Sequence, residues 1–192
     1  MQYLRQFIAE HEIPRAEAAI FQHLVDIYAS ETNKVASLWS EVPPEHMEFR
    51  PHPRSSSNRQ NMVHQILSER RFFAEFIGFE EHPVETLLPP ENAPPEAYIE
   101  QLIRHSRPRL DALANADQPF WLTEVPFFDV RRQRIWVFWR RVLHTAHHRA
   151  QLGDSLRLLE SRVPPTYGPT ADVTWTGADP TTTLDAARRA QP

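Results

Sequence analysis

The sequence contains no cysteine among its 192 residues. This absence excludes disulfide bonds, zinc sites built on thiolates and catalysis by a cysteine nucleophile. Glycine is also scarce, because the chain has only four glycines and they lie far apart. Loops that bind phosphate need closely spaced glycines, so the sequence carries no nucleotide-binding fingerprint. The common nucleotide-dependent enzymes are therefore disfavoured.

Long hydrophobic runs are missing as well. No stretch approaches the length that a bilayer span requires, and residues 1–8 lack the apolar core of a signal peptide. We therefore expect a cytoplasmic protein without a membrane partner.

Positive charge is not in surplus, since the net charge is −4. Nonspecific binding to nucleic acid requires a basic surface, so we expect no nucleic-acid partner. Five arginines gather near the start of the last predicted helix, and we interpret them as a solvated helix face beside buried aromatic residues. They are Arg131, Arg132, Arg134, Arg140 and Arg141.

Four long segments carry apolar residues at helical spacing, which predicts an all-α fold. Four such helices around one core are typical of a four-helix bundle. The expected helices run from about 14 to 41, from a serine-rich cap at 55–58 to Gly78, through 98–113 with a kink at Pro108, and from about 130 to 160. Residues 117–129 are expected to form an aromatic-rich loop that folds back onto the bundle.

The bundle is expected to occupy one domain, residues 1–172, followed by a tail at 173–192. The tail is rich in proline, threonine and alanine, and a short helix is expected around 184–189.

A histidine cluster stands inside the last predicted helix, in the segment HTAHHRAQL at 144–152. His144 and His148 are four residues apart, so they lie on one helix face one turn apart. Two imidazoles placed in this way can converge on one metal ion. A third ligand is needed for firm binding, and His64 of the second predicted helix is the candidate because it stands beside the apolar face.

Three neutral imidazoles leave at least one coordination position open, which is typical of a catalytic metal site. The ion would acidify a water molecule or polarise a substrate atom. Imidazole ligands suit zinc, nickel and iron, and we expect zinc or nickel first. The residues by themselves leave an alternative open: His64 also fits a hydrogen-bonded interior histidine, and a chain with ten histidines reaches this spacing by chance.

Neighbouring polar residues could orient the ligands, anchor a substrate or move a proton. His147, Arg149 and Gln151 are candidates for orienting or anchoring, although each also fits a solvated helix face. Three carboxylates are candidates for a general base, and nothing in their spacing chooses among them. They are Glu69, Glu75 and Asp154.

Three segments of the chain together resemble the DinB/YfiT-like superfamily, whose members are proposed metalloenzymes. The segments are FRPHP at 49–53 with NMVHQI at 61–66, HTAHHRAQL at 144–152, and VPPTYGPTAD at 163–172. The resemblance implies a four-helix bundle with up-down-down-up connectivity and a divalent metal bound by His64, His144 and His148. It also implies a homodimer.

Some members of this superfamily are transferases or isomerases that use a low-molecular-weight thiol, and others resemble metal-dependent hydrolases. The resemblance therefore predicts a metal-dependent transferase or hydrolase that acts on a small electrophile, with a thiol as a possible cosubstrate. The alternative is a non-catalytic metal-binding helical dimer, or a stress-linked sensor of a ligand or metal.

Overall fold

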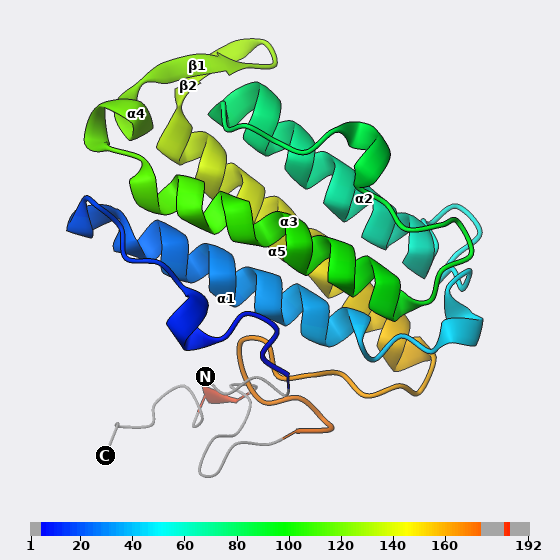
Figure 1. Ribbon diagram of the computed structural model, residues 1–192. Helices are drawn as coiled ribbons and strands as arrows, with labels where there is room; N and C mark the ends of the chain where they lie inside the picture. Colours follow the sequence, from blue (N-terminus) through cyan, green and yellow to red (C-terminus); the bar gives the residue numbers. More distant parts are fainter. Residues whose placement is uncertain (1–4, 174–182, 185–192) are drawn as a thin grey trace.

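The computed structural model describes residues 5–173 and 183–184. This part of the chain is mostly helical, and four long helices lie side by side (Figure 1). The long helices are α1 (Gln22–Trp39), α2 (Asn58–Arg71), α3 (Pro95–Asn115) and α5 (Arg134–Leu158).

Shorter elements connect the long helices. A π-helical segment at Phe72–Ile77 continues α2, and single 3-10 turns lie at Glu10–Glu12, Ala19–Phe21, Pro44–His46 and Val84–Thr86. Between α3 and α5 the chain forms α4 (Gln118–Leu122) and an antiparallel hairpin of β1 (Glu124–Phe127) and β2 (Val130–Gln133).

The four long helices enclose one hydrophobic core. Helix α1 packs against α3 and α5, and α2 packs against the same two helices. Large side chains from every long helix are buried in this core, and each contributes about 1.5–3 kcal/mol of transfer free energy. Examples are Trp39, Met62, Tyr98 and Phe138, and Trp121 of α4 is buried against Phe138.

Helix α2 has clear local start and stop signals. Ser57 caps its first turn: the Ser57 hydroxyl accepts from the Gln60 N–H, and the Gln60 side chain accepts from the Ser57 N–H. The helical run ends at Gly78, whose φ of 89° is a left-handed conformation that glycine adopts without steric cost. The expected end at Gly78 is confirmed, and the position of His64 along α2 is fixed between these two signals.

The first helix begins later than the sequence predicted. Helix α1 starts at Gln22 and not near Pro14. The Gln22 side chain accepts from the Ala16 N–H and donates to the Pro14 carbonyl, so it satisfies this backbone outside a helix. Local hydrogen bonding of this kind competes with helix formation.

The sequence analysis missed the hairpin and the short helix α4 before it. Residues 117–133 were expected to be loop and helix, but β1 and β2 pair with Val125 opposite Arg132 and Phe127 opposite Val130. Side chains of β1 alternate between exposed and buried, and the Phe127 ring contacts Phe72 and Phe76. The segment therefore does fold back onto the helices, as expected, but it does so as a strand pair.

Two further expectations concern α3 and the tail. Helix α3 continues as one α-helix through Pro108, which lies on its exposed face. The short helix expected around 184–189 lies outside the described residues except for Leu184.

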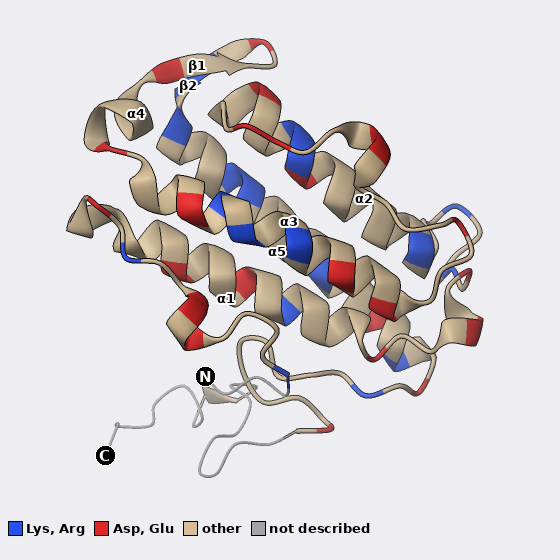
Figure 2. Ribbon diagram, in the orientation of Figure 1, with Lys and Arg blue, Asp and Glu red and all other residues tan. Residues whose placement is uncertain are grey.

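Charges of both signs are distributed along every long helix (Figure 2). Among the described residues, no helix is both long and apolar enough to cross a membrane.

His105 provides a test of the packing of α3. Its side chain is 1% exposed and its ring lies 4.8 Å from the His82 ring. Burial, assisted by the charges of Arg109 and Arg104, lowers the pKa of His105 from 6.5 to about 4.

We expect His105→Leu to flatten the dependence of stability on pH below 6.5. Above pH 6.5 the histidine is neutral in both states. Between pH 6.5 and about 4 the unfolded chain binds a proton that the folded chain resists, so wild-type stability falls by up to about 3 kcal/mol. Urea unfolding from pH 7 to pH 4 measures this, with the exposed His11→Leu as control; equal slopes for wild type and His105→Leu would contradict the assignment.

Candidate metal centre

Three histidines from two helices meet between α2 and α5. His64, His144 and His148 each present one ring nitrogen, and these three atoms lie within 4.8 Å of one another. The ring centroids of His64 lie 5.3 Å from His144 and 4.5 Å from His148. The structure therefore brings together the three residues that the sequence analysis selected.

The cluster lies near the surface and not inside the core. His144 and His148 are half-buried, whereas His64 is exposed, in contrast to its expected place beside the apolar face. Helix α2 turns Met62 and Ile66 into the core, and His64 between them points toward α5 from the rim. A ligand or ion at this position is reached directly from solvent.

The imidazoles are held in their neutral form. Burial, followed by the positive charge of Arg141, lowers the pKa of His144 to about 3. Burial and the neighbouring His64 lower the pKa of His148 to about 4, and burial and Arg141 also lower the pKa of His64. Neutral imidazole is the form that binds metal, so ligation at neutral pH does not require any of the three rings to release a proton to solvent.

The spacing of the nitrogens fits a shared cation. The Nε2 atoms of His144 and His148 lie 3.1 Å apart. With metal–nitrogen bonds of about 2.0–2.1 Å, two such atoms would subtend an angle of roughly 100° at one ion. This angle suits tetrahedral or octahedral coordination, so the donor set and its spacing both fit a divalent metal.

Gln151 orients His148 from one turn further along α5. Its Oε1 atom lies 2.9 Å from His148 Nδ1, and its Nε2 atom lies 3.0 Å from His147 Nε2. An amide oxygen accepts the Nδ1 hydrogen, which leaves the Nε2 lone pair of His148 free for a metal. The expected orienting role of Gln151 fits this geometry, and His147 contacts Gln151 beside the three-histidine cluster.

Arg149 lies elsewhere, which corrects the expectation that it orients a ligand. One residue along a helix is a rotation of about 100°, so Arg149 points from His148 toward α1. There it is 3% exposed and forms an ion pair with Glu31, and its guanidinium lies 4.6 Å from the centre of the Tyr167 ring. Arg149 thus joins α5 to α1 and to the segment that follows α5.

Arg141 is the site residue that the sequence analysis missed. It was assigned to a solvated face, but its side chain is 2% exposed. Its NH1 atom lies 2.9 Å from His144 Nδ1, and its NH2 atom donates to a carboxylate oxygen of Glu69 at 3.1 Å. The available signal was its position three residues before His144, which places both side chains on one helix face.

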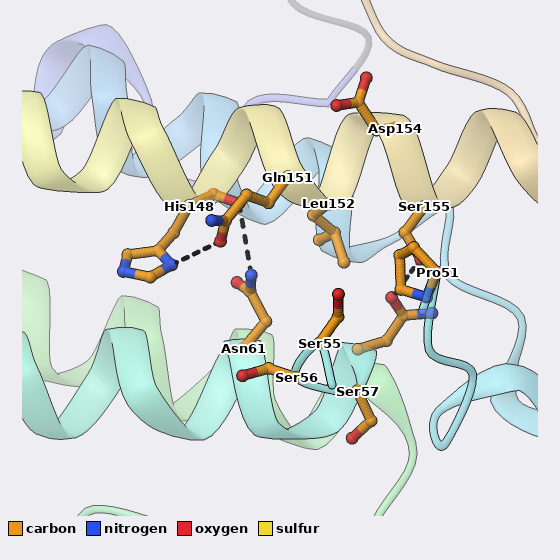
Figure 3. A pocket seen from close by; sticks show the side chains of 11 residues that line it. Pro51, Ser55, Ser56, Ser57, Asn61, His148, Gln151, Leu152, Asp154 and Ser155 are labelled. Carbon is orange, nitrogen blue, oxygen red and sulfur yellow. Dashed lines mark hydrogen bonds between the residues drawn. The ribbon is translucent and has the colours of Figure 1, made fainter. Parts of the chain in front are cut away.

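None of the three carboxylate candidates lies in the histidine cluster. Glu69 is 4% exposed and engaged by Arg109 and Arg141, and both arginines lower its pKa despite its burial. Glu75 is exposed and pairs with Arg71. Asp154 points away from the gap between α2 and α5 (Figure 3).

A cleft of about 340 Å³ adjoins the cluster at His148. Serines at the start of α2 lie on one side, and Gln151, Leu152 and Ser155 of α5 lie on the other (Figure 3). Asn61 lies between them, and its amide nitrogen is 3.5 Å from the His148 carbonyl. Hydroxyl and amide groups share this lining with the apolar side chains of Pro51 and Leu152, so the cleft suits a small molecule that has both polar and apolar parts.

Comparison with known proteins gives a consistent family. Residues 28–152 match the sequence pattern of the DinB superfamily. A DinB-like protein from Bacillus cereus has a similar structure, with a TM-score of 0.66 and 14% identity over 75% of this chain and 95% of that one. A DinB-like protein from Bacillus subtilis gives a TM-score of 0.58 and 17% identity over 74% and 95% of the two chains. No curated protein matches.

The structural role of Arg149 can be tested by stability. We expect Arg149→Met to lower the free energy of unfolding by about 3 kcal/mol, because it leaves the buried carboxylate of Glu31 with one cation fewer. The triple variant Glu31→Gln/Lys34→Met/Arg149→Met should lose less, since Lys34 is the second buried partner of Glu31 and all three charges are then removed together. Urea denaturation measures both, and Arg157→Met, which breaks an exposed ion pair with Asp172, should cost less than about 1 kcal/mol. A loss as small as that of the control would contradict this role.

Proposed function

Because the chain belongs to the DinB superfamily, we propose that it is a metal-dependent enzyme whose divalent ion is held by His64, His144 and His148. The observation that carries the proposal is the meeting of three imidazole nitrogens from two helices beside a cleft. Three ligands leave a coordination position for water or substrate, which distinguishes a catalytic from a structural site.

Zinc or nickel is the proposed ion, with iron as a further candidate, because the ligands are all imidazoles. A bound ion would supply Lewis-acid activation of a thiol cosubstrate or of a water molecule. The reaction is accordingly a thiol-dependent transfer to a small electrophile or a metal-dependent hydrolysis.

The protein's own residues bind and orient. Gln151 accepts from His148 Nδ1 and so keeps its Nε2 atom directed at the cluster. Ser55, Ser56 and Asn61 offer hydrogen-bonding groups to a small substrate in the adjoining cleft. Glu69 and Glu75 are paired with arginines, and Asp154 points away from the gap between α2 and α5, so we assign no carboxylate as general base.

We extend the proposal to the assembly of the chain. The long helices form an up-down-down-up bundle in a domain of residues 1–172, with 173–192 as a tail, and the protein is a cytoplasmic homodimer. Support for the dimer comes from apolar side chains exposed along α5. These are Trp136, Trp139 and Leu143, which are 42%, 37% and 64% exposed.

The metal site predicts stoichiometric binding. Protein purified without an affinity-resin metal should bind one Zn²⁺ or Ni²⁺ per chain in calorimetric titration. His64→Ala and His144→Ala should each weaken binding by more than the roughly 10- to 100-fold that loss of an outer hydrogen-bond partner costs, whereas Gln151→Ala should fall within that range. His52→Ala, an exposed histidine of the loop before α2, serves as the control. Equal binding by wild type and His144→Ala would rule out this ligand set.

Catalysis is tested separately from binding. Metal-loaded protein should convert a chromogenic aryl halide in the presence of a small thiol, or a chromogenic ester in its absence, and His144→Ala or a chelator should abolish turnover. Metal binding that raises the melting temperature without turnover of either substrate class would favour the non-catalytic alternative.

A further inference from the structure

Arg141 is fixed in place by contacts on three sides. Its NH1 atom donates to Ser68 Oγ at 3.0 Å, and its NH2 atom donates to the Gln65 carbonyl at 3.2 Å and to Glu69 at 3.1 Å. The side chain is 2% exposed. The guanidinium therefore has a defined orientation, and it directs NH1 at His144 Nδ1 at 2.9 Å.

The donor and the acceptor in the contact between Arg141 and His144 follow from the chemistry of the two groups. A guanidinium has five N–H donors and no acceptor, so His144 Nδ1 must accept. A neutral imidazole carries one hydrogen, and with Nδ1 accepting, that hydrogen is on Nε2. The Nε2 atom of His148, whose own hydrogen is on Nδ1 facing Gln151, lies 3.1 Å away and can accept it.

A metal ligand needs the opposite tautomer. Coordination through His144 Nε2 uses the lone pair of that atom, so the ring hydrogen must move to Nδ1. A protonated Nδ1 then faces an N–H of Arg141, and two donors cannot share a hydrogen bond. Metal-binding histidines ordinarily donate their second N–H to an acceptor such as a carboxylate or carbonyl.

We propose that Arg141 is a positioning residue that opposes metal binding, because it holds His144 in the tautomer whose Nε2 atom bears the hydrogen. Metal binding at His144 then requires the Arg141 guanidinium to move away from His144 Nδ1 and to keep only its hydrogen bonds to Ser68, Gln65 and Glu69. This links occupancy of the site to the buried ion pairs between the helices. The inference rests on the proposed three-histidine site, and it predicts the sign of a change in affinity.

The decisive variant is Arg141→Met, which removes the donor and retains an unbranched side chain. We expect its Zn²⁺ affinity to be roughly tenfold higher than that of wild type, the equivalent of one charge-assisted hydrogen bond that no longer has to be broken. Calorimetric titration with Zn²⁺ measures this. If wild type binds Zn²⁺ and Arg141→Met binds it equally well or more weakly, the inference about Arg141 is overturned but the metal site stands. Binding by neither protein overturns both.

Two further variants guard against effects of folding. In Arg141→Met, Glu69 still has Arg109 and the Tyr28 hydroxyl as partners. The double variant Arg141→Met/Glu69→Gln also removes the charge of the carboxylate. It should show the same gain in Zn²⁺ affinity. Arg134→Met is the matched control, because Arg134 is a half-buried arginine of α5 that donates to the Ile77 and Phe120 carbonyls. Its Zn²⁺ affinity should equal that of wild type, and a similar gain in this control would overturn the inference.

A second readout does not depend on affinity. Long-range ¹H–¹⁵N correlation spectra report which nitrogen of each imidazole carries the hydrogen, and His144→Gln assigns the His144 signals by their loss. Before Zn²⁺ is added, wild type should show an unprotonated Nδ1 at His144; after addition Nδ1 should be protonated. A protonated Nδ1 before addition, or an unprotonated one in the Zn²⁺-loaded protein, overturns the proposal.

Discussion

One buried carboxylate joins all four long helices. Glu69 of α2 accepts from the Tyr28 hydroxyl of α1, from Arg109 of α3 at 2.9 Å and from Arg141 of α5 at 3.1 Å. A buried charge is costly unless it is paired and hydrogen-bonded, so separating these partners lowers the stability of the fold. Their shared requirement fixes the positions of the helices relative to one another.

The histidine cluster is built directly on this charged centre. Arg141 contacts Glu69 with one nitrogen and His144 with the other, so the core and the site share a guanidinium. The same arrangement explains the neutral imidazoles, because burial and the charge of Arg141 both lower the pKa of His144. A second pair, Glu31 and Arg149, holds α5 to α1 about two turns further along α5.

Predictions from the sequence succeeded where the pattern is local or strongly periodic. The long helices follow from apolar spacing, the end at Gly78 from its tolerance of positive φ, and the pairing of His144 with His148 from their spacing of four. They failed where a distant contact decided the conformation. Gln22 displaced the helix start, and packing of Phe127 on Phe72 stabilised a hairpin whose strands span only four residues each.

The sequence by itself determined the helical class, the candidate ligands His64, His144 and His148, and the absence of any cysteine thiolate from the chain. Only the tertiary structure decided which charged side chains are buried. An arginine in a helix is predicted to be solvated unless its partner is known. The carboxylate partners of Arg141 and Arg149 are Glu69 and Glu31, which lie 72 and 118 residues away in the sequence. Spacing along one helix can indicate a pair of metal ligands, but whether a hydrogen-bond donor or an acceptor faces the second nitrogen of each ligand depends on the folded chain.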